Sequence, residues 1–252
     1  FQAEDGIRDR SPSRGLGDVY KRQTRTTASR AKLKWYSKNA ARNFALIKTV
    51  LFDLGGVVLE SPLEVITNFE KTVGLRHGTV NKVILEGGDT GPWACLERGQ
   101  ISMADFCHEI DHQSKKAGTP FSSQHLMSAF DEMARVRPQV IEVVRSLRKR
   151  GQTVAALTNN WHSGGILEDR FAELREEFDL MVESWKVGLR KPEAAIYQLV
   201  LSRVGARPEE TVFLDDFGIN LKPARALGMH TIKVGSVEDV VSGLCEVFGE
   251  PI

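Results

Sequence analysis

The stretch from Thr49 to Leu59 constrains the fold of this chain more than any other segment. It begins with the apolar and β-branched run TVLF, reaches a single carboxylate at Asp53, and continues into the glycine pair Gly55-Gly56. Such a run predicts a buried strand of a parallel sheet, and the glycine pair predicts a tight turn at the carboxyl end of that strand. Open α/β sheets bind their ligands at that end. Asp53 is therefore the first candidate for a functional residue.

The same strand pattern recurs further along the chain. Helical patterns separate four more apolar runs, at 154–157, 180–182, 211–214 and 231–234. Strands that alternate with helices of about a dozen residues indicate an α/β fold with a doubly wound parallel sheet. Because proline favours the first turn of a helix, we expect helices to begin at Pro138 and Pro192.

One helical block, at 61–135, interrupts this alternation. Its apolar residues recur at helical spacing, and glycines mark the breaks between its helices. We therefore expect a core made of 47–60 and 136–252, with 61–135 inserted as a helical cap over the glycine turn. Trp93 in this cap and Trp161 in the core are candidates for lining a substrate pocket, although core packing explains them equally well.

Polar residues follow the predicted strands at their carboxyl ends. They are Asp53, Thr158, Lys191 in a loop, and the pair Asp215-Asp216. A carboxylate nucleophile, a hydroxyl, an ammonium and an acidic pair are what phosphoryl transfer through an aspartyl-phosphate requires. Carboxylates also bind hard cations such as Mg²⁺, which bridge to phosphate. The pattern predicts a Mg²⁺-dependent site for a small phosphorylated molecule.

Taken singly, these side chains have ordinary structural explanations. Thr158 could simply end a strand, and Lys191 could be a solvated loop charge. Asn220, early in a predicted helix, could be a helix cap. The case for a site rests on their occurrence together at matching strand ends.

Four segments resemble, in order, the four motifs of the haloacid dehalogenase superfamily. They are 52–57 (FDLGGV), 157–160 (LTNN), 190–193 (RKPE) and 213–220 (FLDDFGIN). The sequence of residues 220–229 (NLKPARALGM) resembles the N-terminal phosphatase domain of soluble epoxide hydrolase and the related N-terminal domain of some acyl-CoA dehydrogenase family members. The resemblance covers about Ile47 to Phe248, and it implies a Rossmann-like core with a helical cap between the first two motifs.

The resemblance implies a role for each candidate residue. Asp53 would be the nucleophile, and Thr158, Asn159 and Lys191 would bind the phosphate, with Lys191 balancing charge at the phosphoaspartate. Asn220 would orient the site. The implied Mg²⁺ ligands are Asp53, the carbonyl of Gly55, Asp216, and Asp215 through water.

Gly55 departs from the usual pattern of the family. Most members have a second aspartate at this position, two residues after the nucleophile, where it protonates the leaving alkoxide and later activates water. Such acid–base groups contribute roughly 10²–10⁴-fold to the rate. We therefore expect a slow phosphatase that favours substrates with good leaving groups, such as aryl or anomeric phosphates and anhydrides.

Two alternative functions stay open at this point. A 2-haloacid dehalogenase needs no second aspartate because chloride leaves without protonation, but the Asp215-Asp216 pair suits Mg²⁺ and phosphate better. A catalytically degenerate binding module would also explain Gly55. The chain contains no nucleophile motif of the hydrolase fold, so we do not expect epoxide hydrolysis.

Composition excludes several further classes. A net charge of +1 argues against a generally basic nucleic-acid surface, and no apolar run approaches the roughly 20 residues of a membrane span. Three cysteines without metal-type spacing indicate a reducing compartment, and we expect a cytoplasmic protein.

The first 46 residues are expected to be a disordered tail. Residues 1–23 resemble translated sequencing-adapter read-through, a non-native segment, and 24–45 contain basic but no acidic residues. A mitochondrial location becomes the expectation if the basic stretch is a genuine transit peptide.

Overall fold

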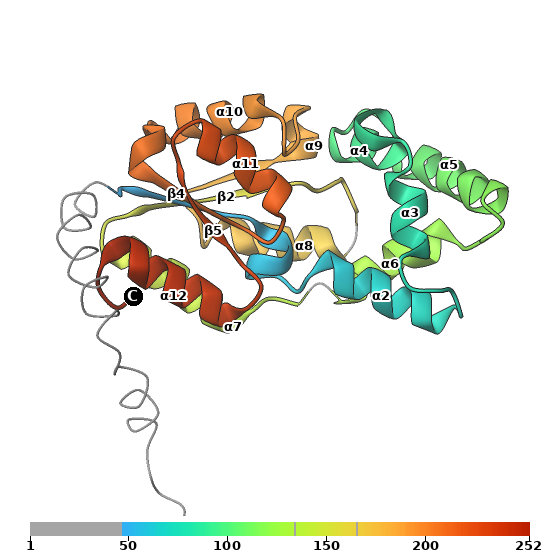
Figure 1. Ribbon diagram of the computed structural model, residues 1–252, viewed down its shortest axis with the longest axis horizontal. Coiled ribbons are helices and arrows are strands. Elements are labelled where there is room, and N and C mark those ends of the chain that lie inside the picture. The colour runs from blue at the N-terminus through green and yellow to red at the C-terminus, as the bar shows by residue number, and fades with distance from the viewer. Residues whose placement is uncertain (1–46, 134, 165) are drawn as a thin grey trace, which may run out of the picture. The chain divides into compact units, whose positions relative to one another are not determined.

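The computed structural model describes residues 47–133, 135–164 and 166–252. The expected tail, with its adapter-like and basic segments, lies outside these ranges. The described chain contains a five-stranded, all-parallel sheet in the order β3-β2-β1-β4-β5 (Figure 1). The strands are β1 (Thr49–Phe52), β2 (Thr153–Thr158), β3 (Leu180–Glu183), β4 (Thr211–Asp215) and β5 (His230–Lys233). The predicted strands all form, and the strand that leads to Asp53 is central.

Helices cover both faces of this sheet. One face packs against α7 (Pro138–Lys149), α8 (Ile166–Arg175) and α12 (Val237–Phe248). The other packs against α10 (Ala194–Val204) and α11 (Gly218–Ala226). The alternation of side chains along β1 explains both contacts, because Val50 and Phe52 belong to the first apolar cluster and Leu51 to the second. The doubly wound arrangement predicted from the sequence is thus confirmed.

Between β1 and α7 the chain forms a helical cap (Figure 1). Its elements are α2 (Pro62–Thr72), α3 (Thr79–Leu85), η3 (Gly88–Thr90), α4 (Pro92–Glu97), α5 (Met103–Lys116) and α6 (Ser123–Met133). These helices have an apolar cluster of their own, which includes the fully buried Val80, Phe106 and Leu126. Trp161 of the core also packs against this cluster. The cap is therefore a folded layer with its own core.

The two chain segments that join the cap to the core run side by side. Leu59 and Val136 form an antiparallel bridge, and Arg137 N donates to Val58 O at 2.8 Å. The Arg137 guanidinium also donates to the carbonyl of Gly56 at 2.8 Å. The cap connection is consequently anchored to the turn that follows Asp53.

Pro192 differs from the expectation that it would open a helix. The Lys191–Pro192 peptide is cis, and α10 begins two residues later at Ala194. Glu193 N donates to Arg190 O at 2.9 Å, so Pro192 lies within a tight turn. Proline lacks an N–H and suits such a turn as well as a helix start, which is why the sequence did not separate the two.

No helix in the described ranges is both long and apolar enough to span a bilayer.

Candidate active site

Asp53 lies buried immediately after β1. Its Oδ1 accepts a hydrogen bond from Leu54 N at 2.7 Å, and its Oδ2 lies 2.8 Å from Nζ of Lys191. The chain then turns through η2 (Leu54–Val58), where Gly56 has a φ of +74°. A Cβ at Gly56 would lie 2.1 Å from Oδ2 of Asp216, so glycine is required both by its φ and by this close approach. The turn brings the first and last acidic residues of the site together.

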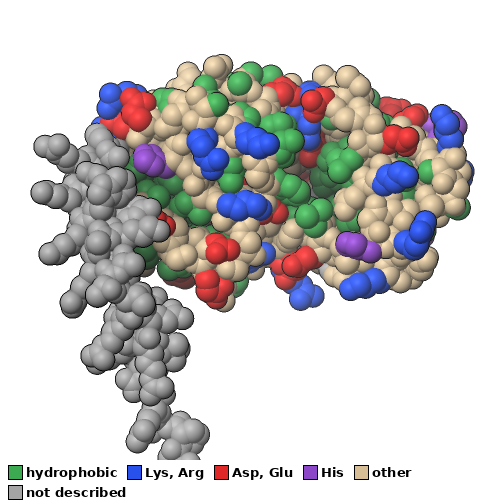
Figure 2. Space-filling view, viewed as in Figure 1, with side chains coloured by type: hydrophobic (Ala, Val, Ile, Leu, Met, Phe, Trp, Pro, Cys, Tyr) green, Lys and Arg blue, Asp and Glu red, His purple; other side chains and the backbone are tan. Residues whose placement is uncertain are grey.

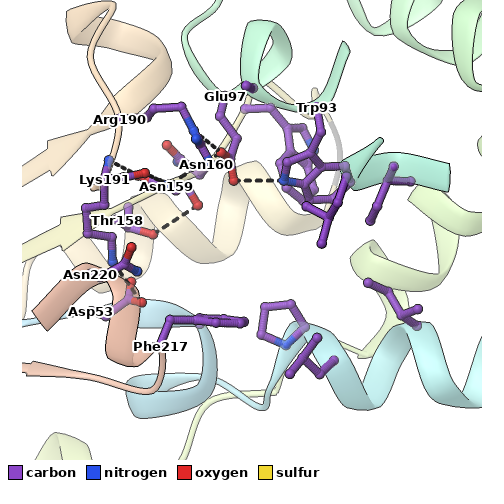
Figure 3. A pocket seen from close by; sticks show the side chains of 18 of the residues that line it. Asp53, Trp93, Glu97, Thr158, Asn159, Asn160, Arg190, Lys191, Phe217 and Asn220 are labelled. Atoms are coloured by element: carbon purple, nitrogen blue, oxygen red, sulfur yellow. Dashed lines mark hydrogen bonds and ion pairs between the residues drawn. The ribbon is translucent and has the colours of Figure 1, made fainter. Parts of the chain in front are cut away.

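Lys191 is a buried cation between two carboxylates. Its side chain is 1% exposed, and Nζ lies 2.8 Å from Asp53 and 2.7 Å from Asp215. The Asn159 amide fixes its backbone, since Oδ1 accepts from Lys191 N at 2.8 Å and Nδ2 donates to Lys191 O at 3.0 Å. Lys191 is therefore not the solvated loop charge that the sequence left open (Figure 3).

Asp215 is held by neighbours on both of its oxygens. Asn220 Nδ2 donates to Oδ1 and Oδ2 at 3.1 Å each, and Phe217 N donates to Oδ1 at 2.7 Å. Tyr197 in turn donates its hydroxyl to the carbonyl of Asn220 at 2.7 Å. The N-cap of α11 is Phe217, so Asn220 acts on Asp215 instead of capping the helix.

Thr158 stands at the end of β2, facing the same space as Asp53. It is buried, lines the cavity described below, and its Oγ1 makes one long hydrogen bond of 3.4 Å to the carbonyl of Asn159 in the described chain. Its hydroxyl can therefore turn toward a ligand without breaking a strong bond.

The acidic residues have the arrangement of a cation site. Asp53, Asp215 and Asp216 offer carboxylate oxygens that all lie within 4.8 Å of one another. Oδ1 of Asp216 is buried and has no hydrogen-bond partner among the described residues. Three carboxylates beside Lys191 and Lys233 leave an excess of negative charge, and oxygen donors are what Mg²⁺ prefers. The residues present therefore fit a Mg²⁺ ion.

Burial and mutual repulsion perturb these acids in the metal-free protein. Burial raises the pKa of the Asp53 carboxyl well above its ordinary value, with Lys191 opposing the rise and the other two acids adding to it. Burial and then Asp215 raise the pKa of Asp216 to about 6. Burial alone would lower the pKa of Lys191, but its two carboxylate neighbours raise it instead. Protons and a cation thus compete for the same carboxylates.

A cavity of about 450 Å³ leads from these residues toward the cap. Asp53, Thr158 and Lys191 line one part of it, and the remainder is mostly apolar. Trp93 and Trp161 both line it and pack edge to face, with ring centroids 5.4 Å apart. Both tryptophans thus line the cavity as well as packing together. Figure 2 shows hydrophobic side chains gathered in the hollow between the core and the cap.

The polar side of this cavity contains two charged residues, Glu97 and Arg190, for which the sequence predicts no role. Glu97, at the end of α4, is 6% exposed, and its Oε2 accepts from Arg190 Nε at 2.6 Å. Arg190 also donates to Oδ1 of the exposed Asp89 at 3.1 Å. The sequence offered one signal for Arg190, its place beside Lys191, and none for the burial of Glu97.

The chain is similar to three proteins with the following names. It is 36% identical over 225 residues to acyl-CoA dehydrogenase family member 10 of Mus musculus, covering 87% of this chain and 20% of that protein. It is 31% identical over 216 residues to bifunctional epoxide hydrolase 2 of Sus scrofa, covering 81% and 39%. It is 27% identical over 190 residues to a sesquiterpene phosphatase of Aspergillus oryzae, covering 72% and 87%. The chain thus spans under half the length of the first two.

Two solved structures share the fold. A HAD-like family hydrolase from Porphyromonas gingivalis has 26% identity and a TM-score of 0.62, covering 81% of this chain and 99% of that one. A HAD family enzyme from Bacteroides thetaiotaomicron, an aspartate-to-alanine mutant in complex with magnesium and inorganic phosphate, has 26% identity and a TM-score of 0.55. That match covers 74% of this chain and 93% of the other.

A family model gives the remaining comparison. The model of the haloacid dehalogenase-like hydrolases matches residues 47–228, which include the first part of the core, the cap, the second part of the core as far as Gly228, and every candidate residue from Asp53 to Asn220. This chain therefore belongs to the haloacid dehalogenase-like hydrolases.

Proposed function

We propose that this hydrolase is a Mg²⁺-dependent phosphatase that acts on an organic phosphate through a phosphoaspartate on Asp53. The observation that carries the proposal is the buried array of Asp53, Lys191 and Asp215 beside the unpartnered carboxylate oxygen of Asp216. An unpartnered carboxylate oxygen beside two further carboxylates suits a hard cation, so the array favours metal-dependent phosphate chemistry over dehalogenation.

The steps follow from the contacts of the chain's own residues. A carboxylate oxygen of Asp53 attacks phosphorus, and the bond from phosphorus to the leaving oxygen breaks. Lys191 and the Thr158 hydroxyl hold the phosphoryl oxygens, and Asn159 keeps Lys191 in place. Mg²⁺ held by Asp53, Gly55 and Asp216, with Asp215 acting through water, would neutralise charge between nucleophile and phosphate. Water then hydrolyses the phosphoaspartate, which releases inorganic phosphate and restores Asp53.

Gly55 determines which substrates suit this site. It has no side chain that can give a proton to the leaving oxygen, so a leaving group that departs as a stable anion is favoured. Aryl phosphates and anhydrides have such leaving groups.

The cavity favours an apolar group on the substrate. Its wall contains Trp93, Phe130 and Trp161, and three of its lining residues, Leu63, Leu85 and Ile219, are exposed by 41%, 59% and 59%. An organic group bound there would cover apolar surface that is otherwise in contact with water. The sesquiterpene phosphatase among the relatives is consistent with this substrate class, and the magnesium and phosphate complex of the Bacteroides enzyme is consistent with the cofactor.

The test is release of p-nitrophenol from p-nitrophenyl phosphate, with Mg²⁺ and with a chelator. We expect turnover that needs the metal and is abolished in Asp53→Asn, while Asp169→Asn, an exposed aspartate on α8, retains it. Mg²⁺ binding without turnover would favour the binding module. Chloride release from a 2-haloacid that survives the chelator would favour the dehalogenase.

A further inference from the structure

Helix α4 presents one residue to the apolar cavity and another to the catalytic side of the core. Trp93 lines the cavity wall, and its Nε1 donates to Oε1 of Glu97 at 3.0 Å. The other oxygen of Glu97, Oε2, accepts from Arg190 at 2.6 Å and from Asn159 Nδ2 at 3.4 Å. Figure 3 shows Glu97 between these core residues and the indole of Trp93. A single buried carboxylate thus contacts the substrate wall and the core.

Asn159 continues this chain of contacts to Lys191. The same amide that faces Glu97 binds the N–H of Lys191 at 2.8 Å and its carbonyl at 3.0 Å. Glu97 is therefore separated from the Lys191 backbone by one side chain. The Lys191 ammonium, at the other end of that residue, contacts Asp53.

The end of α4 is also packed directly on the core. A Cβ at Gly99 would lie 2.6 Å from the carbonyl of Trp185, in helix α9 (Ser184–Val187). A second ion pair joins the same regions, since Arg98 Nε lies 2.7 Å from Glu193. Among the described residues, neither side chain of that pair hydrogen-bonds to Trp93, Asn159 or Lys191. Removing the pair therefore tests cap attachment without removing the contacts of Glu97.

Resting on the phosphatase activity proposed above, we propose that Glu97 is a positioning residue that couples the apolar wall of the cavity to Lys191. An apolar group packed on Trp93 restrains the indole, and through Glu97 and Asn159 it restrains the backbone of Lys191. The ammonium is then held between Asp53 and the phosphoryl group. Binding of the apolar group consequently raises kcat, as well as lowering KM.

The kinetic test uses two substrates with the same leaving-group chemistry, acetyl phosphate and lauroyl phosphate. In Glu97→Gln we expect kcat for lauroyl phosphate to fall about tenfold, because small misplacements of catalytic groups have large effects. We expect kcat for acetyl phosphate to fall at most about threefold, because this substrate has no long apolar group to pack on Trp93. Glu193→Gln removes the other ion pair and should leave both kcat values within about twofold. An equal fall for both substrates in Glu97→Gln, or a change confined to KM, would overturn the proposal.

A second test needs no turnover. The indole N–H resonance of Trp93, assigned with Trp93→Phe, should shift when Lys191→Met is introduced into the wild-type chain. The same substitution should leave the resonance in place in a Glu97→Gln background and should still shift it in a Glu193→Gln background. Coupling seen without phosphatase activity would refute the proposed function and support the role of Glu97. A shift that persists in Glu97→Gln, or that never occurs in the wild-type background, would refute that role even in an active enzyme.

Discussion

Gly55 lies directly against Pro62, the first residue of helix α2 in the cap: a Cβ added to Gly55 would be 3.0 Å from Cγ and 3.2 Å from Cδ of the proline ring. The backbone of Gly55 has φ −63° and ψ 127°, a conformation that any residue adopts. The backbone at position 55 would therefore accept an aspartate, and only the space beside Pro62 opposes its side chain.

This relationship makes Gly55→Asp a direct test of the leaving-group argument. We expect turnover of alkyl phosphates to rise at least about tenfold. The gain should stay below the roughly 10²–10⁴-fold that general acids contribute, because the Pro62 ring has to move by a few tenths of an ångström to admit the side chain. Gly55→Asn meets Pro62 in the same way and supplies no acid, so it should give no increase. If Asn and Asp act alike, or if Asp gives no gain even with Pro62→Ala, the acid is not what the site lacks.

Gly56→Ala should impair the site more than it impairs the fold. The positive φ alone costs on the order of 1 kcal/mol of unfolding free energy, and the new Cβ would also displace Asp216. Gly118→Ala has a similar φ of +70° with open space around it, and it measures the backbone cost alone. Calorimetric Mg²⁺ titration should show weakened binding in Gly56→Ala and unchanged binding in Gly118→Ala. Equal Mg²⁺ affinities would show that Asp216 is not a ligand.

The pKa of Asp216 predicts how pH and Mg²⁺ affect stability. Because burial and Asp215 raise this pKa from 3.8 to about 6, the stabilising contribution of the protonated group is complete below pH 3.8 and is lost as pH rises through about 6. Mg²⁺ binds the ionised form. Added Mg²⁺ should therefore raise the melting temperature more at about pH 7.5 than at about pH 5, and Asp216→Asn should reduce that difference. An equal rise at both pH values would contradict the prediction.

Lys191→Met should destabilise the protein through its buried charges. The substitution leaves Asp53 and Asp215 without their cation, and breaking such a buried pair costs about 3–5 kcal/mol of unfolding free energy. The loss should be larger at about pH 8 than at about pH 5, because burial raises the pKa of Asp53 and this carboxyl can take up a proton at the lower pH. Lys186→Met, which removes a 41% exposed partner of Glu183, serves as the control and should cost far less. Denaturant unfolding at both pH values measures the difference.

Local sequence was sufficient for the sheet and for much of the candidate site. Asp53 follows a run whose apolar residues can be buried on both faces, and this pattern specifies a central parallel strand without knowledge of its neighbours. Glu97 shows where that reasoning stops. Its partners Asn159 and Arg190 lie 62 and 93 residues away in sequence, so its burial depends on how the cap docks. The prediction that a helix begins at Pro192 is wrong for another reason, because proline suits a tight turn and the first turn of a helix equally well.

The pairing of Leu59 with Val136 has a consequence for how such chains can be recombined. The segments at which the inserted helices leave and rejoin the sheet layer are adjacent, so cutting at both and joining a different insert would leave the register of β1 with its neighbours unchanged. Such a cassette exchange would have to retain Arg137, whose guanidinium binds the carbonyl of Gly56. Caps could thus be exchanged between relatives to change the substrate cavity, while Asp53, Asp215 and Asp216 stay in place.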